Sequence, residues 1–289
     1  MQISILLAQQ IAQLFLILIM GYAVVKSGLL KASDSRVLSV VMVYLVTPCV
    51  IINAFQIDDT PEIRKGLLYS MAVAAAIHVV LLVLSALLSR PLKLDAVEQV
   101  NVIYSNAAAL VIPLVKALMG DAYVIYSCAF IIVQLVLLWT HASSLLQGSS
   151  ALDWKKVLTN INMIAIAAGA LLYWFRVVLP APLQNTMSTV GNMMGPMGML
   201  LAGMAIAEKP LREVFCTRRN YLPTVLRLVV CPLVVLVLLW VCHASSWVAD
   251  GKNILMTVYL AAITPACATV TSMAQLYDRD AAHSSALYV

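Results

Sequence analysis

Two stretches of the chain decide the fold: YSNAAALVIPL at residues 104–114 and ITPACATVTS at residues 263–272. Each places small or polar residues and a proline inside a long apolar segment. Proline lacks an amide proton and clashes with the carbonyl four residues back, so helix breaks are expected at Pro113 and Pro265. Hydrocarbon tolerates the freed backbone groups only where protein or a cavity satisfies them. We therefore expect the two breaks to face each other across a polar cavity.

The composition around these stretches is that of a membrane protein. Of the 289 residues, 63 % are hydrophobic and 11 % are charged. A soluble domain is about 45–50 % apolar and about 25 % charged, so water-soluble enzyme folds are excluded. The net charge of +5 fits loop charges of a membrane protein and indicates no nucleic-acid partner. The six cysteines form no C-x-x-C pair, which favours packing roles over disulfides or a metal site.

The sequence predicts an all-α polytopic membrane protein with ten helices. Nine apolar segments are long enough to span a bilayer: 4–25, 37–56, 67–89, 99–119, 122–146, 158–179, 186–207, 221–243 and 253–276. A tenth begins near Ala281, where only nine residues remain. Nine helical residues reach about 13 Å, against a bilayer core of about 30 Å. The tenth helix is therefore expected to be largely missing from this sequence, as in a truncated chain.

The prolines predict an internal repeat. Pro48 and Pro196 are 148 residues apart, and Pro113 and Pro265 are 152 apart. Five helices per copy is an odd number, so the second copy must insert upside down. The prediction is a single membrane domain, 1–289, made of inverted repeats 1–150 and 151–289. Broken helices four and nine at matching positions are typical of secondary transporters.

The candidate site residues lie at or beside the two breaks. We expect substrate contacts from Ser105, Asn106, Pro113, Lys116, Thr264, Pro265 and Thr269, and from Asn53 in the second segment. The N-termini of half-helices carry partial positive charge and free N–H groups, which suit a carboxylate or another anion. Lys116 either draws anions to the crossover or snorkels to the interface, and for Arg227, inside the eighth segment, snorkelling is favoured.

These motifs resemble the auxin efflux carrier family, of the bile acid/sodium symporter-like superfamily. Residues 105–120 are similar to its first crossover helix, whose usual form is S-N-T-G-x-x-G-I-P-L, and residues 264–285 are similar to its second. The Gly21–Leu30 stretch, Pro48 and the Met197–Gly203 stretch also match. Where the family favours Thr and Gly, this chain has Ala107, Ala108 and Val111, so milder unwinding is expected there.

The resemblance implies a carrier that exports or exchanges small organic anions such as carboxylates, with substrate near the crossover. No enzymatic activity and no cofactor or metal are expected. The lipid bilayer and an organic anion are the expected partners, while proton or sodium coupling and a homodimer stay open. Two alternatives also stay open: a transport-inactive sensor or scaffold, and a sodium-coupled organic-anion symporter.

The charges of the connections predict the orientation in the cell membrane. The odd-numbered connections hold twelve Lys and Arg residues and the even-numbered ones hold five. By the positive-inside rule, the loops at 26–36 and 208–220 are cytoplasmic and the N-terminus is outside. Cysteines introduced into the N-terminal tail should react with an impermeant thiol reagent in intact cells. Labelling of that tail from the inside only would contradict this orientation.

Overall fold

The fold is a bundle of helices, several of which are interrupted. The computed structural model describes residues 2–56, 60–148, 154–242, 247–248 and 250–288. One group of helices comprises α1 (Gln2–Lys26), α2 (Ser35–Val41), α3 (Thr47–Ala54), α10 (Ile161–Trp174), α11 (Ala181–Gly191) and α12 (Met194–Ile206). A second group comprises α4 (Pro61–Ser89), α5 (Ala96–Ile103), α6 (Ile112–Met119), α7 (Val124–Leu137), α8 (Ser143–Gln147), α14 (Arg218–Val225), α15 (Cys231–Val241) and α16 (Gly251–Ile263).

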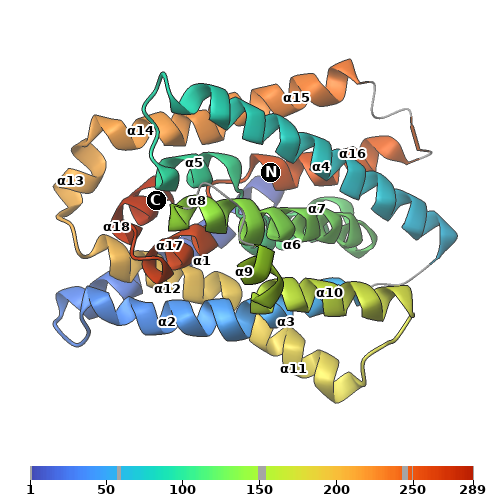
Figure 1. Ribbon diagram of the computed structural model, residues 1–289, viewed down its shortest axis with the longest axis horizontal. Helices are drawn as coiled ribbons and strands as arrows, with labels where there is room; N and C mark the ends of the chain where they lie inside the picture. The colour runs from blue at the N-terminus through green and yellow to red at the C-terminus, as the bar shows by residue number, and fades with distance from the viewer. Residues whose placement is uncertain (1, 57–59, 149–153, 243–246, 249, 289) are drawn as a thin grey trace.

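Figure 1 shows the arrangement of the two groups. Helices α4 and α15 lie along one edge, α2, α3 and α11 lie along the opposite edge, and α5, α6 and α7 lie between them. Helices α17 (Ala268–Leu276) and α18 (Ala281–Tyr288) fill the space between the groups. Four shorter elements lie in connections: helices α9 (Trp154–Thr159) and α13 (Leu211–Cys216) and the 3₁₀ turns η1 (Ala32–Asp34) and η4 (Asp121–Tyr123).

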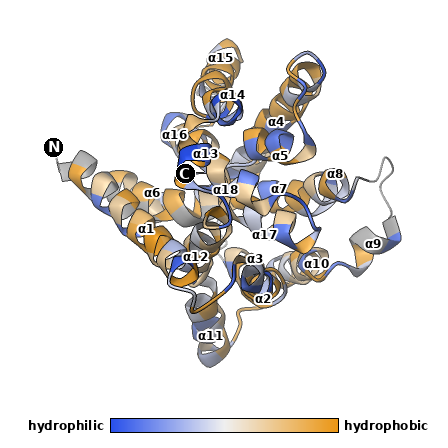
Figure 2. Cartoon of the chain, turned by 90° about the vertical axis from the view of Figure 1, so that its left-hand side faces the viewer, coloured by the Kyte–Doolittle hydropathy of each residue, from blue (hydrophilic) through white to orange (hydrophobic). Residues whose placement is uncertain are grey.

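The outer surface confirms the all-α polytopic membrane protein that the composition predicts. Five helical stretches of the described chain are long and apolar enough to cross a membrane: 32–54, 61–89, 124–147, 181–206 and 218–241. Large apolar side chains on the outside of four helices, Leu16, Leu87, Leu171 and Trp240, are more than half exposed. Apolar colour accordingly covers much of the outward helices in Figure 2. An apolar surface of this extent fits contact with lipid.

Three prolines inside the long helices follow a π-helical turn by two residues. The turns are η2 (Met42–Val46) before Pro48, η3 (Ala107–Val111) before Pro113 and η6 (Leu226–Val230) before Pro232. In the first and third, the N–H of the residue before the proline bonds to the carbonyl five residues back, Thr47 to Met42 and Cys231 to Leu226. The wider turn removes the clash that proline makes with the carbonyl four residues back. These prolines therefore mark widened turns in continuous helices.

The expected break of helix four at Pro113 is wrong in its position. The helix ends at Ile103 and resumes at Ala107, so the break comprises Tyr104, Ser105 and Asn106. Pro113 lies inside the second half, where η3 accommodates it. In helix nine the break is where the sequence predicts it, because Thr264–Cys267 separate α16 from α17. The inverted relation of residues 1–150 and 151–289 stays a prediction.

Helices α1 and α12 pack at very short range. A Cβ atom on Gly21 would overlap the backbone carbonyl of Leu200, and a Cβ on Gly203 would overlap that of Leu18. Two reciprocal glycines thus let the two backbones approach, as is typical of helix pairs in membranes.

Replacing Gly21 by alanine should push α1 and α12 apart. Over-packing of this kind costs about 1–3 kcal/mol, so we expect a lower melting temperature for the purified protein in detergent. Ala23, two residues along the same helix, is exposed, and Ala23→Val is therefore the matched control. Equal melting temperatures for Gly21→Ala and Ala23→Val would contradict the close packing.

Candidate functional site: the crossover of two broken helices

The two helix breaks lie against each other and pair as a short antiparallel bridge. Ser105 lies opposite Ala266. The Asn106 N–H donates to the Pro265 carbonyl over 2.8 Å, and the Cys267 N–H donates to the Tyr104 carbonyl over 3.1 Å. Each break therefore satisfies part of the backbone that the other leaves free. We call residues 104–106 and 264–267 the crossover.

Gln134 of α7 satisfies the other edge of Ser105. Its side-chain oxygen accepts from the Ser105 N–H at 3.0 Å and from the Ser105 hydroxyl at 2.7 Å. Its Nε2 donates to the Ser105 carbonyl at 2.8 Å. A primary amide thus pairs with both backbone polar groups of one residue, as a neighbouring strand would. Gln134 and Ser105 are both buried.

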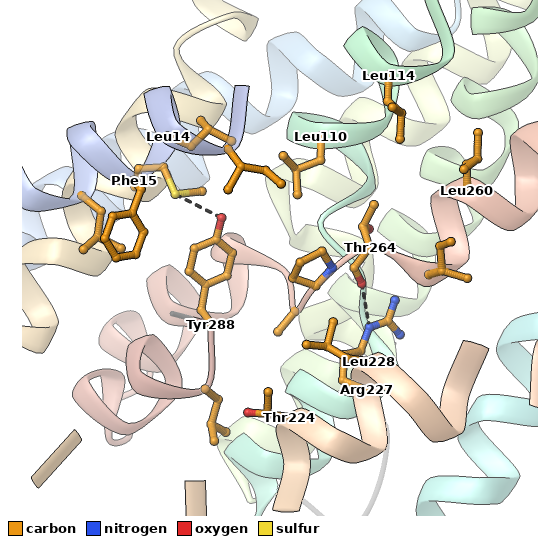
Figure 3. Close-up of a pocket in the computed structure, with 17 residues that line it drawn as sticks. Leu14, Phe15, Leu110, Leu114, Thr224, Arg227, Leu228, Leu260, Thr264 and Tyr288 are labelled. Carbon is orange, nitrogen blue, oxygen red and sulfur yellow. Dashed lines mark hydrogen bonds between the residues drawn. The ribbon is translucent and has the colours of Figure 1, made fainter. Parts of the chain in front are cut away.

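Arg227 of η6 is buried and binds the carbonyl ends of both interrupted helices. Its Nη1 donates to the carbonyls of Val102 and Ile103, both at 3.1 Å, at the end of α5. Its Nε donates to the Thr264 carbonyl at 3.0 Å, and its Nη2 donates to the Ala262 carbonyl at the end of α16. Figure 3 shows the guanidinium beside Thr264. The snorkelling role expected for Arg227 is wrong, because its side chain turns into the protein.

The structure brings together four of the predicted site residues. Ser105, Asn106, Thr264 and Pro265 all belong to the crossover. The Asn106 side chain is 4 % exposed and donates to the Tyr288 hydroxyl of α18 at 3.1 Å, and this hydroxyl donates to the Met199 sulfur of α12. Asn106 therefore links the crossover to the first helix group.

The other four predicted residues lie outside the crossover. Thr269 is buried in the first turn of α17, and Asn53 lies near the end of α3. Pro113 and Lys116 belong to α6, but their side chains lie outside the described part of the structure. Sequence reasoning missed Gln134, although a glutamine within the apolar run FIIVQLVLL (130–138) is the signal that could have found it.

Two cavities adjoin this region. The first, which we call the crossover cavity, has a volume of about 390 Å³ and is lined mostly by apolar side chains of α1, α6 and α16. Its polar lining comes from Thr224, Arg227, Thr264 and Tyr288 (Figure 3). Because all three guanidinium nitrogens of Arg227 already donate to carbonyls, in four hydrogen bonds, little of the guanidinium is left for a ligand.

The second cavity, which we call the interface cavity, has a volume of about 510 Å³ and separates the two helix groups. Its lining includes Gln13 of α1, Asn53 of α3, Ser188 of α11, Asn192 and, from the second group, Ile112 of α6 and Cys128 of α7. Amide and hydroxyl groups therefore gather on one wall, opposite an apolar wall formed by α6 and α7. Asn53 is the predicted site residue that this cavity contains.

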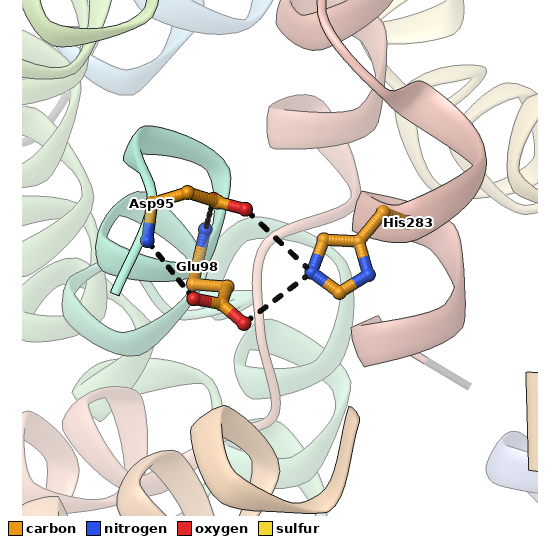
Figure 4. A group of neighbouring side chains, drawn as sticks. All are labelled: Asp95, Glu98 and His283. Carbon is orange, nitrogen blue, oxygen red and sulfur yellow. Dashed lines mark hydrogen bonds and ion pairs between the residues drawn. The ribbon is translucent and has the colours of Figure 1, made fainter. Parts of the chain in front are cut away.

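Two acidic side chains and a histidine lie together at the N-terminal end of α5, away from the crossover. Asp95 caps the helix, and Asp95, Glu98 and His283 approach one another in Figure 4. Both oxygens of the buried Glu98 carboxylate bind Arg219, at 2.6 and 2.5 Å, while His283 lies at 3.6 Å. An arginine that engages both oxygens indicates an ion-pair cluster rather than a metal centre.

Helix α18 contributes His283 to this cluster, and Asp280 caps its N-terminus. Burial alone would raise the pKa of Asp280, but hydrogen bonds from Lys209 and from the His283 N–H hold this pKa below its ordinary value. The Asp280 carboxylate is thereby kept charged directly before the first residue of α18, at the end of a helix where a negative charge is stabilising.

Replacing Gln134 by leucine should destabilise the crossover. The change leaves the buried N–H and carbonyl of Ser105 without their partner, and each unsatisfied group costs about 1–3 kcal/mol. We expect a clear fall in the melting temperature of the purified protein.

Thr140→Val is the matched control on the same long helix, because the Thr140 hydroxyl bonds only to carbonyls of its own helix, Val136 and Leu137. A Gln134→Leu protein as stable as Thr140→Val would show that the pairing with Ser105 contributes nothing.

Comparison with known proteins agrees with this architecture. A family model described as a membrane transport protein matches residues 6–153, which is half of the chain and includes the first broken helix. A search of curated proteins found no match. Because the matched region carries the S-N motif and the π-turn before Pro113, the match and the structure agree on one class. The chain belongs to the auxin efflux carrier family of membrane transport proteins.

Proposed function

We propose that this membrane transporter moves small organic anions, such as carboxylates, across the cell membrane by alternating access. The observation that carries the proposal is the crossover, in which two membrane helices break at the same point. Broken helices cost free energy in hydrocarbon unless every freed group is satisfied. A chain that uses Gln134 and Arg227 to satisfy them is expected to gain a function from the break, and in transporters that function is substrate binding.

The charges of the half-helix ends favour an anion. Two helix N-termini begin at the crossover, after Asn106 and after Cys267, and each carries partial positive charge. Two C-termini, of α5 and α16, end there with partial negative charge, and the guanidinium of Arg227 neutralises them. The balance left at the crossover is positive. This supports a carboxylate as the transported group.

The interface cavity is the proposed substrate site, because Ile112 in its lining belongs to the half-helix that begins at the crossover, after Asn106. It lies between the two helix groups, so a relative movement of the groups would open it to one side of the membrane and then to the other. Asn53, Gln13 and Ser188 offer N–H and O–H donors to a carboxylate. Lys116 follows Ile112, which lines this cavity, by one turn of α6 and is proposed as the residue that attracts anions.

Flux measurements with purified protein in vesicles test the proposal. Labelled mono- and dicarboxylates should be taken up, whereas neutral and cationic compounds of similar size should not. The predicted external N-terminus gives the orientation expected in cells only. In vesicles, flux should therefore be measured for both orientations of the protein. Uptake of cations in preference to carboxylates would overturn the assignment of substrate class.

Asn53→Leu should lower carboxylate flux at matched protein level, by about tenfold if one hydrogen bond to a charged group is lost. The side chain keeps nearly the same volume, so the protein should insert normally. Asn185→Leu is the matched control, because Asn185 is exposed on α11 and lies outside the cavity lining. Wild-type flux from Asn53→Leu would remove the interface cavity from the mechanism.

A further inference from the structure

The four carbonyls that Arg227 binds form a set suited to a cation. They belong to Val102, Ile103, Ala262 and Thr264, which end two half-helices that come from opposite halves of the chain. Each helix C-terminus carries about half a negative charge, and the two meet at one buried point. In transporters with interrupted helices, unwound carbonyls and half-helix C-termini are where a coupling sodium ion or proton binds.

The guanidinium fills this point with a permanent positive charge. Arginine stays protonated in proteins, and its planar fork can donate five hydrogen bonds. The Arg227 side chain is 2 % exposed, and none of the salt bridges among the described residues includes it. Its partners are backbone carbonyls, so its charge is balanced by the two helix dipoles and by no carboxylate of the described chain. A charge buried in this manner is retained in a membrane protein where it serves a function.

We propose that Arg227 is a built-in cation that occupies the place of a coupling ion at the crossover. This inference rests on the proposed transport function and deepens it: the carrier should move its anion without a sodium ion. Because the carbonyls are already bound, a sodium ion would have to displace a tethered guanidinium that makes four hydrogen bonds. The sodium-coupled alternative left open by the sequence is therefore disfavoured.

The same geometry predicts that a cation added to the solution can replace the charge that is lost when Arg227 is mutated. Arg227 lines the crossover cavity, so truncation to alanine leaves a space that continues into an existing cavity. A free guanidinium ion has the shape and the donors of the lost group. It should bind at millimolar concentration and restore the bridging of α5 and α16.

The first experiment measures the melting temperature of purified Arg227→Ala in detergent. Loss of the four hydrogen bonds should lower it by about 5 °C or more. Guanidinium chloride at millimolar concentration should recover much of this loss, whereas urea, a neutral molecule of the same shape, and sodium chloride should not. Arg36→Ala, which removes an exposed arginine paired with Asp278, is the control and should not respond to guanidinium. Equal responses to guanidinium and urea, or no loss of stability, would overturn the inference.

The second experiment uses the wild-type protein, so it does not depend on whether a variant folds. A coupled ion changes substrate affinity by about 5- to 150-fold. Carboxylate flux should therefore change by less than about fivefold when sodium is replaced by potassium or choline. A larger dependence on sodium would overturn the inference.

The two experiments separate the inference from the proposed function. If carboxylates are not transported but guanidinium restores Arg227→Ala, the proposed substrate class is wrong and the built-in cation stands. Arg227→Lys, which keeps the charge but cannot form the planar fork, should show a melting temperature between those of wild type and Arg227→Ala. A lysine variant no more stable than alanine would show that charge at this point contributes nothing, against the inference.

Discussion

The satisfaction of backbone hydrogen bonds inside hydrocarbon is the constraint on which this structure depends. Breaking two membrane helices frees N–H and carbonyl groups that lipid cannot bind, and each would cost several kcal/mol. The crossover meets this cost from three sources: the two breaks pair with each other, Gln134 pairs with Ser105, and Arg227 binds four carbonyls. The positions of α7 and η6 follow, because their side chains must reach one point.

Two arginines of one neighbouring helical segment, α14–η6, bind the two ends of helix α5. Arg219 binds Glu98 in its first turn, and Arg227 binds the carbonyls of its last residues. The two arginines are eight residues apart, which is about 12 Å along a helix, and α5 has the same length of eight residues. Because the lengths match, the α14–η6 segment can hydrogen-bond to both ends of α5 at once.

Proline has two different effects in this chain. Pro48, Pro113 and Pro232 each follow a π-helical turn that widens the helix and removes the clash, so those helices continue. Pro265 lies within a real break, where its carbonyl accepts from Asn106 instead of from its own helix. The difference lies in whether the freed groups find partners locally or across the bundle. Proline content alone does not reveal which of these occurs.

The sequence by itself determined the class of protein and the two helices that break. Apolar segments of membrane length fix an all-α polytopic fold, and the S-N and T-P stretches identify Ser105, Asn106, Thr264 and Pro265, which the structure brings together. Tertiary structure alone decided the position of the first break, the role of Arg227 and the place of Asn53 in a separate cavity. The physical reason is that a buried polar group must have a hydrogen-bond partner, but the sequence does not show which residue that partner is. Gln134 and Arg227 lie 29 and more than 120 residues from the first break, and only packing brings them to it.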